Sequence, residues 1–237
     1  MSFLKAEWRK LIMTNYQVNP DVLKPYVPNG TELDFYNNKC YVSVIGFMFK
    51  NTKLLGVKIP FHINFEEVNL RFYVKRRVDG EYKRGVVFIK EIVPKPAITF
   101  IANTVYNENY ETLPMKHSWK TIEDKVQVTY QWKKNNKWNS IVVEAENKLN
   151  EIKEKSDIEF ISEHYWGYAK NKNTTTEYEV KHPKWSFYKV LNYNINVDFL
   201  STYGKSFEVL QNKKPLSVFL IEGSCISVES KTELRDY

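Results

Sequence analysis

The stretch NFEEVNLRFYVKRRVDGEYKRGVVFIKEIV, residues 64–93, decides the fold class of this chain. Two apolar-rich runs surround Asp79-Gly80, and an Asp-Gly dipeptide in that setting favours a two-residue type I′ turn. The stretch therefore predicts a long antiparallel hairpin. With the turn at Asp79-Gly80, Arg71 should pair with Phe88, and residues that pair directly share one face of the sheet.

The predicted register separates two faces of this hairpin. One face is apolar except at its Glu91 end and should pack on the core; it holds Val68, Leu70, Phe72, Val74, Gly85, Val87, Ile89 and Glu91. The other face mixes polar and apolar residues; it holds Glu67, Asn69, Arg71, Tyr73, Val86, Phe88, Lys90 and Ile92. Since a ligand cavity combines apolar walls with a few converging polar groups, the mixed face predicts a small-molecule cavity.

The polar residues of the mixed face suggest chemical roles. Arg71 could hold a substrate carboxylate through a two-pronged contact. Lys90 would lie near that positive charge, which favours the neutral amine, and a neutral lysine can act as a nucleophile or a base. Glu67 could either move protons or keep Lys90 charged. Glu67 and Lys90 are thus the catalytic candidates, and Arg71, Asn69, Tyr73 and Phe88 are the substrate-binding candidates.

An ordinary sheet surface is the alternative interpretation. In that case Glu67 and Lys90 form a diagonal ion pair, Arg71 stacks on Phe88 or Tyr73, and nothing binds. The assignment also depends on register, because a one-residue slip, or a bulge at Arg84-Gly85, would exchange the two faces.

Outside this hairpin the chain remains rich in predicted strands. Asn37-Asn38-Lys39 and Asn135-Asn136 predict two further hairpin turns. Short helices are expected at Asn19-Pro20-Asp21, from Pro96, from Ser156 and before Gly204. The opening segment to about Tyr16 carries no clear assignment. This pattern predicts a mainly β fold, an antiparallel sheet that closes into a barrel or cone, in a single domain spanning residues 1–237.

Composition agrees with a folded β domain and limits its chemistry. The chain has 237 residues, of which 43% are hydrophobic and 15% aromatic. Cys40 and Cys225 lie far apart and are expected to be two buried free thiols. No glycine-rich phosphate loop or GxSxG motif occurs, so no cofactor is expected.

The four histidines are scattered along the chain, which argues against a metal site. They are His62, His117, His164 and His182. His62 is the exception for function, since it precedes the Glu67 strand by five residues and could lie at the cavity mouth. We interpret His182-Pro183-Lys184-Trp185 as a packing corner in preference to a pocket wall.

The formal charge of +7 raises the question of nucleic-acid binding. Only six of the 35 basic residues are arginines, and many lie at predicted turn tips, so solvated hairpin ends explain them better. No apolar run approaches the length of a membrane span, and the N-terminal segment lacks the features of a signal peptide. We therefore expect a cytoplasmic protein without a membrane partner.

Several motifs together resemble the YqjF-like family of uncharacterised proteins. They are the segment from Trp8 to Phe49, the string Phe65-x-Glu67-x-Asn69-x-Arg71-x-Tyr73-Val74, RGVVFIKEIVP at 84–94, HYWGY at 164–168, KHPKW at 181–185, Tyr203-Gly204 and PLSVFLIEGS at 215–224. This family is similar to the acetoacetate decarboxylase-like superfamily, which implies a closed antiparallel β-cone, a central pocket and frequent homo-oligomerisation.

The resemblance also supplies a test of mechanism. In the decarboxylases a Pro-Lys-Lys string provides the Schiff-base lysine and a second cation, and the corresponding region here is Leu113-Pro114-Met115-Lys116. Met115 stands at the expected nucleophile position, which argues against Schiff-base decarboxylation. Either Lys116 or Lys90 has taken over that role, or the pocket performs different chemistry, or it only binds.

Three functional hypotheses remain open from the sequence. The leading one is a small-molecule pocket protein, with or without enzymatic activity, for a small carboxylate- or carbonyl-containing compound. The second is a non-catalytic metabolite sensor or carrier. The third and weakest is a nucleic-acid binder that uses the basic hairpin tips, which predicts a steep loss of affinity with added salt.

Overall fold

The long hairpin forms as its sequence predicts, from strands β5 (Phe65–Val78) and β6 (Glu81–Val93). The computed structural model describes residues 2–171 and 174–235. Asp79 and Gly80 have φ angles of 50° and 90°, as a type I′ turn requires, and Val78 pairs with Glu81 beside them. The turn chemistry therefore fixes where the hairpin folds back.

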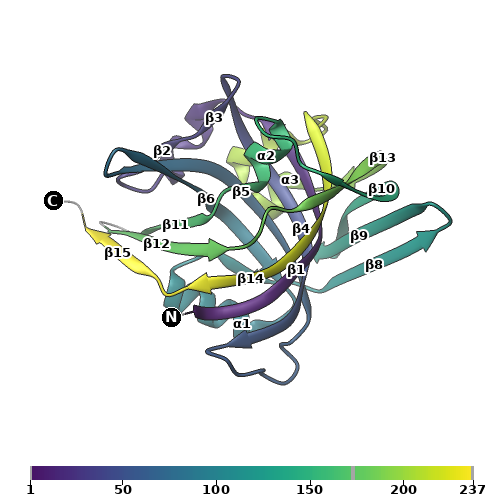
Figure 1. Ribbon diagram of the computed structural model, residues 1–237, viewed down its shortest axis with the longest axis horizontal. Helices are drawn as coiled ribbons and strands as arrows, with labels where there is room; N and C mark the ends of the chain where they lie inside the picture. The colour runs from purple at the N-terminus through teal and green to yellow at the C-terminus, as the bar shows by residue number, and fades with distance from the viewer. Residues whose placement is uncertain (1, 172–173, 236–237) are drawn as a thin grey trace.

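The chain is mainly β, with short helical segments between strands (Figure 1). The other strands are β1 (Ser2–Gln17), β2 (Glu32–Leu33), β3 (Phe35–Tyr36), β4 (Lys39–Leu54), β7 (Tyr110–Thr112), β8 (Met115–Ile122), β9 (Lys125–Lys134), β10 (Lys137–Glu151), β11 (Trp166–Asn171), β12 (Thr174–Lys181), β13 (Ser186–Asn196), β14 (Ser217–Glu229) and β15 (Thr232–Arg235). The helical segments are η1 (Pro20–Val22), η2 (Lys24–Tyr26), α1 (Pro96–Ile101), η3 (Ala102–Tyr106), α2 (Asp157–Ser162), α3 (Phe199–Tyr203) and η4 (Lys205–Leu210).

Local signals set several of these boundaries as expected. The Asn19 side chain accepts a hydrogen bond from Asp21 N at the start of η1, and Ser156 caps α2 by accepting one from Glu159 N. Pro96 lies in the first turn of α1. The N-terminal segment, which the sequence left unassigned, is the 16-residue strand β1.

The strands pair in the order β15-β12-β11-β6-β5-β4-β1-β14-β13-β10-β9-β8, with an additional pairing of β12 with β14. Most pairings are antiparallel, but β6 pairs in parallel with both β11 and β7. The sheet is therefore mixed, which corrects the expectation of a purely antiparallel one. The strands are not spread evenly around one axis, so the closed barrel or cone stays a prediction.

Alternating side chains of the central strands build two apolar clusters on opposite sides of the sheet. One cluster contains Val42, Val44, Val68, Leu70 and Phe72, together with residues of β9, β10, α3 and η4. The other contains Ile45, Phe47, Phe49, Phe65 and Tyr73, together with residues of α2. The candidate site lies on the side of the second cluster.

A β-bulge between β5 and β6 changes the predicted register. Arg71 pairs with Phe88 as expected, but Leu70 then pairs with Lys90 and Asn69 with Glu91, which leaves Ile89 as the extra residue. Beyond the bulge the faces exchange. The placement of Glu91 on the packing face and of Lys90 opposite Asn69 was therefore wrong.

Two further features concern the surface. Cys40 is a buried free thiol as expected, whereas Cys225 is exposed, which corrects the expectation of two buried thiols. Within residues 2–171 and 174–235, none of the helices has the length and apolar character needed to cross a membrane.

Candidate functional site

A cavity of about 200 Å³ lies beside the second apolar cluster. Residues of β1, β4, β5 and β6 line it, together with residues of α1, β11 and β12. Its walls are mostly apolar; they include Trp8, Phe47, Phe49, Phe65, Phe88 and Ile98. Its polar lining comprises Glu67, Asn69, Arg71, Glu91, Glu108, Tyr110, His164, Tyr178 and His182, among others. This combination is typical of a small-molecule site.

The mixed face predicted from the sequence supplies the centre of this cavity. Glu67, Asn69, Arg71 and Phe88 all line it, as does His62. The first three side chains are buried, with at most 8% of each residue exposed. The alternative of a solvated sheet surface is therefore wrong for these residues.

Three other predicted residues lie outside the cavity lining. Tyr73 is buried beside it; its hydroxyl oxygen lies 2.7 Å from Ser43 Oγ, and its ring packs on the ring of Phe160. The Lys90 ammonium contacts the Glu111 carboxylate at 2.9 Å.

Lys116, the remaining lysine candidate, is exposed, and its Nζ lies 4.7 Å above the Trp138 ring. Met115 packs against the first apolar cluster. Among the described residues no lysine lines the cavity, so neither lysine candidate faces a bound molecule there.

One side of the cavity gathers three carboxyl groups and two phenols. The amide of Asn69 donates a hydrogen bond to Glu67 across 2.9 Å, and the Tyr110 hydroxyl donates a second across 3.2 Å. The Tyr178 hydroxyl donates to Glu108 across 2.8 Å. Glu91 lies among them because of the bulge, and its Oε2 atom has no hydrogen-bond partner among the described residues.

Burial makes these carboxyl groups hard to ionise. Desolvation raises the pKa of Glu67 to about 7, although the hydrogen bonds from Asn69 and Tyr110 and the charge of Arg71 act in the opposite direction. Desolvation and the neighbouring Glu67 raise the pKa of Glu108 to about 8. The pKa of Glu91 is raised as well, by burial and by its two acidic neighbours. At neutral pH this group of carboxyls therefore keeps protons that can be transferred.

Arg71 adds a positive charge to the cavity lining. Arg71 donates from one terminal nitrogen to the Ile161 carbonyl across 3.0 Å, whereas its Nε has no partner among the described residues. His164 lies nearby, with Nε2 3.4 Å from Asp34, and its Nδ1 is likewise unpartnered. Burial lowers the pKa of His164 to about 4, so the ring is neutral and Arg71 supplies the charge.

A glycine makes room for one of the phenols. A Cβ atom at Gly167 would lie 2.2 Å from Cζ of Tyr178, far inside van der Waals contact. The ring of Tyr178 thus crosses directly over β11 to reach Glu108. Glycine is required here because of close packing and not because of its backbone angles.

The sequence offered weak signals for the residues that it did not identify. Glu108, Tyr110 and Tyr178 come from segments distant from the hairpin, so only the fold brings them to Glu67. Gly167 within HYWGY could have indicated a close approach. His182 lines the cavity and also stacks on Trp185 at 3.9 Å, so it serves both as a packing corner and as a pocket wall.

Metal ligands are not clustered in the part of the chain that the structure describes. No group of three or more His, Cys, Asp or Glu residues there has an arrangement that could hold a metal ion.

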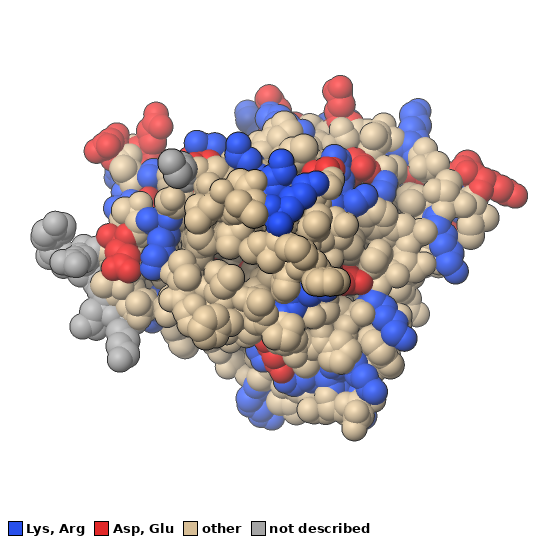
Figure 2. Space-filling view, turned by 90° about the horizontal axis from the view of Figure 1, so that it is seen from below, with Lys and Arg blue, Asp and Glu red and all other residues tan. Residues whose placement is uncertain are grey.

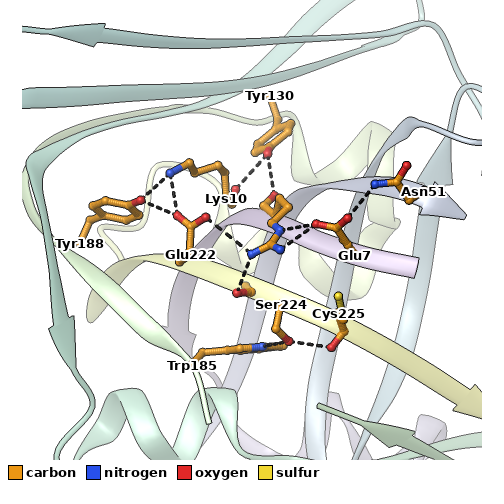
Figure 3. Close-up of polar contacts among 11 residues, drawn as sticks. Glu7, Lys10, Asn51, Tyr130, Trp185, Tyr188, Glu222, Ser224 and Cys225 are labelled. Carbon is orange, nitrogen blue, oxygen red and sulfur yellow. Dashed lines mark hydrogen bonds and ion pairs between the residues drawn. The ribbon is translucent and has the colours of Figure 1, made fainter. Parts of the chain in front are cut away.

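A second polar cluster lies on β1 and β14, outside the cavity lining (Figure 3). Lys10 contacts Glu222 at 2.7 Å and lies beside Tyr188, while Glu7 accepts a hydrogen bond from Asn51. These groups satisfy one another. We therefore interpret the cluster as structural.

Comparison with known proteins places the chain in a family. The model of DUF2071, described as an uncharacterized conserved protein, matches residues 5–224. The chain belongs to the DUF2071 family. It is 32% identical over 72 residues to the uncharacterized protein YqjF of Bacillus subtilis (strain 168), a match that spans only 30% of this chain and 30% of the length of YqjF.

Solved structures similar to this DUF2071 protein share its fold at low sequence identity. Acetoacetate decarboxylase from Legionella pneumophila superposes with a TM-score of 0.69 at 14% identity, covering 99% of this chain and 88% of that one. The enduracididine biosynthesis enzyme MppR complexed with pyruvate gives 0.72 at 10% identity, covering 100% and 92%. An acetoacetate decarboxylase-like enzyme from Sphingomonas wittichii gives 0.67 at 8% identity, covering 100% and 95%. The family expected from the motifs is confirmed by the DUF2071 match, and these solved structures show that the chain shares the acetoacetate decarboxylase-like fold.

Proposed function

We propose that this protein binds a small carboxylate- or carbonyl-containing compound in the cavity and transfers a proton to or from it. The observation that carries the proposal is that a cationic group and a titratable carboxyl group line the same mostly apolar cavity. Arg71 offers an unpartnered, buried Nε, and Glu67 has a pKa of about 7. Three expectations from the sequence remain predictions: that the barrel is closed, that the chain forms a single domain and that the protein is cytoplasmic.

Arg71 is the group that anchors the ligand. A buried, unpartnered guanidinium N–H beside apolar walls binds a carboxylate or a carbonyl oxygen more strongly than it would in water, because the local dielectric constant is low. His164 is neutral at neutral pH; with its Nε2–H donating to Asp34, its unpartnered Nδ1 can accept a hydrogen bond from a hydroxyl group of the ligand. MppR, which shares the fold, is described in complex with pyruvate, and this supports a small oxo acid as the first probe.

Glu67 is the proposed proton-transfer group. A general acid or base works best when its pKa lies near the working pH, and Glu67 meets that condition. In a step of this kind the Glu67 carboxylate removes a proton from the carbon next to the ligand carbonyl, and the electron pair moves onto the carbonyl oxygen. Returning the proton restores the carboxylate. Schiff-base chemistry is no part of the proposal, since no lysine lines the cavity among the described residues.

A non-catalytic carrier or sensor is the second candidate. The mostly apolar walls and the same lack of a cavity lysine among described residues favour simple binding. Carrier and enzyme both predict ligand binding that depends on Arg71. They differ in whether ligand protons exchange.

The experiment that tests the proposal has two parts. A thermal-shift screen of short 2-oxo and 3-oxo acids, with their hydroxy analogues, should identify ligands; one present at about 100 times its dissociation constant adds roughly 2.7 kcal/mol to the free energy of unfolding. The best ligand is then incubated in D₂O with the wild type and with Glu67→Gln. Deuterium incorporation that Glu67→Gln abolishes supports the enzyme, and binding without incorporation supports the carrier. If none of the screened compounds raises the Tm, both the enzyme and the carrier are excluded.

A further inference from the structure

Two neighbouring segments expose an unusual amount of apolar surface. They are residues 51–64, from the end of β4 to the start of β5, and residues 95–106, which contain α1 and η3. Their exposed large hydrophobic side chains, here called the apolar patch, are Leu55, Val57, Ile59, Phe61, Phe100 and Val105. Phe61 is 87% exposed and Phe100 69%, and with Val57 and Leu55 they are the four most exposed large hydrophobic residues of the described chain.

The two segments adjoin each other around the cavity. Ile59 from one and Ile98 from the other line the same cavity. Leu55 N donates to the Phe3 carbonyl across 2.9 Å, and the Phe3 ring lies 4.8 Å from Tyr106 at the end of η3. Both segments lie in the lower part of Figure 1, and Figure 2 views the molecule from that side, where basic and acidic residues surround a broad tan area.

Two apolar residues of the first segment adopt backbone angles that are unfavourable for residues with their side chains. Leu55 and Gly56 form a tight turn with φ angles of 50° and 85°, and Phe61 has a φ of 64°. The comparable turns at Asn37-Asn38, Asp79-Gly80 and Asn135-Asn136 use the residues that tolerate positive φ. Leu and Phe do not tolerate it well, so their presence points to a role outside the packing of this chain.

The charge of the two segments indicates which kind of partner could cover the apolar patch. Residues 51–64 and 95–106 contain three lysines and no acidic residue. Lys53 and Lys58 are exposed and form no ion pair with any described residue. A second copy packed face to face would bring these lysines against their own counterparts, whereas an anionic surface would complement them.

We propose that the apolar patch docks on the surface of an anionic lipid bilayer, which departs from the sequence-based expectation of no membrane partner. Leu55, Phe61 and Phe100 enter the boundary between headgroups and acyl chains, and Lys53 and Lys58 contact lipid phosphates. The docking goes beyond the proposed function and requires no reaction in the cavity. It also brings Ile59 and Ile98, which line the cavity, close to the membrane surface.

The test measures co-sedimentation of the full chain with vesicles of phosphatidylglycerol or of phosphatidylcholine. We expect binding to the anionic vesicles only, with a decrease when salt is added. The double variant Leu55→Asn/Phe61→Asn should bind at least about tenfold less tightly, because two inserted side chains are lost. Asn suits positive φ, so this variant should fold at least as stably as the wild type. Ile122→Asn, at another exposed site beside a turn, should bind like the wild type.

Three results would overturn the docking proposal. One is a failure of the wild type to sediment with phosphatidylglycerol vesicles. Another is equal binding by the double variant. The third is a dimer, seen by light scattering without lipid, that the double variant abolishes, which would assign the apolar patch to a second copy. Binding of a soluble ligand in the cavity should be the same in all variants, so the two proposals fail independently.

Discussion

Tyr110 donates a hydrogen bond to Glu67 across 3.2 Å, and this contact joins β7 to β5. The hydrogen bond stabilises the ionised form of Glu67. It opposes the desolvation that raises the pKa of Glu67 to about 7. Tyr110 therefore adjusts the proton affinity of the proposed catalytic group.

Tyr110→Phe should raise the pKa of Glu67 further. A hydrogen bond to a charged group is worth about 1.5 kcal/mol or more, so the increase should be on the order of one pH unit. The pH profile of deuterium incorporation should move upward by that amount, and NMR titration of the labelled carboxyl carbon should give the same shift. An unchanged profile would contradict the role of Tyr110.

Stability should respond to pH through Glu67 and Glu108. Their pKa values of about 7 and about 8 exceed the ordinary value of 4.5, so between pH 4.5 and these values the folded chain keeps protons that the unfolded chain has released. The free energy of unfolding contributed by these groups therefore falls as the pH rises through that window. Glu67→Gln and Glu108→Gln should each gain roughly 1 kcal/mol or more, relative to the wild type, between pH 5 and pH 8.

Glu111→Gln is the matched control for this pH dependence. Hydrogen bonds from Lys134 and Lys90 lower the pKa of Glu111 below its ordinary value, so it is ionised in both the folded and the unfolded chain above pH 5. The variant should lose a similar amount of stability at pH 5 and at pH 8. Parallel pH profiles for all three variants, measured by urea denaturation, would argue against buried protonated carboxyls.

Gly167→Ala should displace the Tyr178 ring. The added methyl group would meet Cζ of Tyr178 at 2.2 Å, so we expect a loss of about 1–3 kcal/mol in the free energy of unfolding. In a Tyr178→Ala background the same change should cost much less, because its obstacle is gone. Additive losses in this double-mutant cycle would show that Tyr178 does not create the need for glycine.

Borohydride trapping should leave Lys90 and Lys116 unmodified. Lys90 is paired with Glu111 at 2.9 Å and Lys116 is exposed on β8, so neither can meet a carbonyl carbon held at Arg71. Reduction of the protein with pyruvate should therefore give no mass increase on either residue. An adduct that peptide mapping places on Lys90 or Lys116 would reinstate the Schiff-base mechanism.

The parts of this structure that sequence predicts are those governed by local chemistry. Asp79-Gly80 fixes the turn and hence the register near it, so Arg71 and Phe88 pair as expected. Alternation along β5 then places Glu67, Asn69 and Arg71 on one face. The family motif around the same residues pointed to the same fold.

The rest depends on contacts that no local pattern encodes. The bulge at Ile89 inserts a single residue into a regular run, and it moves Glu91 into the cavity and Lys90 out of it. Glu108 and Tyr178 reach Glu67 only through the pairing of β6 with β7 and of β11 with β12. The hairpin and its turn can thus be predicted from the sequence, whereas the places of Glu91, Glu108 and Tyr178 in the site cannot.

Calorimetric titration of Arg71→Met beside the wild type tests the central claim most directly. The ligand is the short oxo acid that gives the largest thermal shift, and a matched Tm without ligand shows that the variant is folded. We predict one binding site per chain in the wild type and at least about a tenfold weaker affinity in the variant, the effect of roughly 1.4 kcal/mol. Equal affinity in both proteins, or no binding of any oxo acid to the wild type at millimolar concentration, would contradict the account.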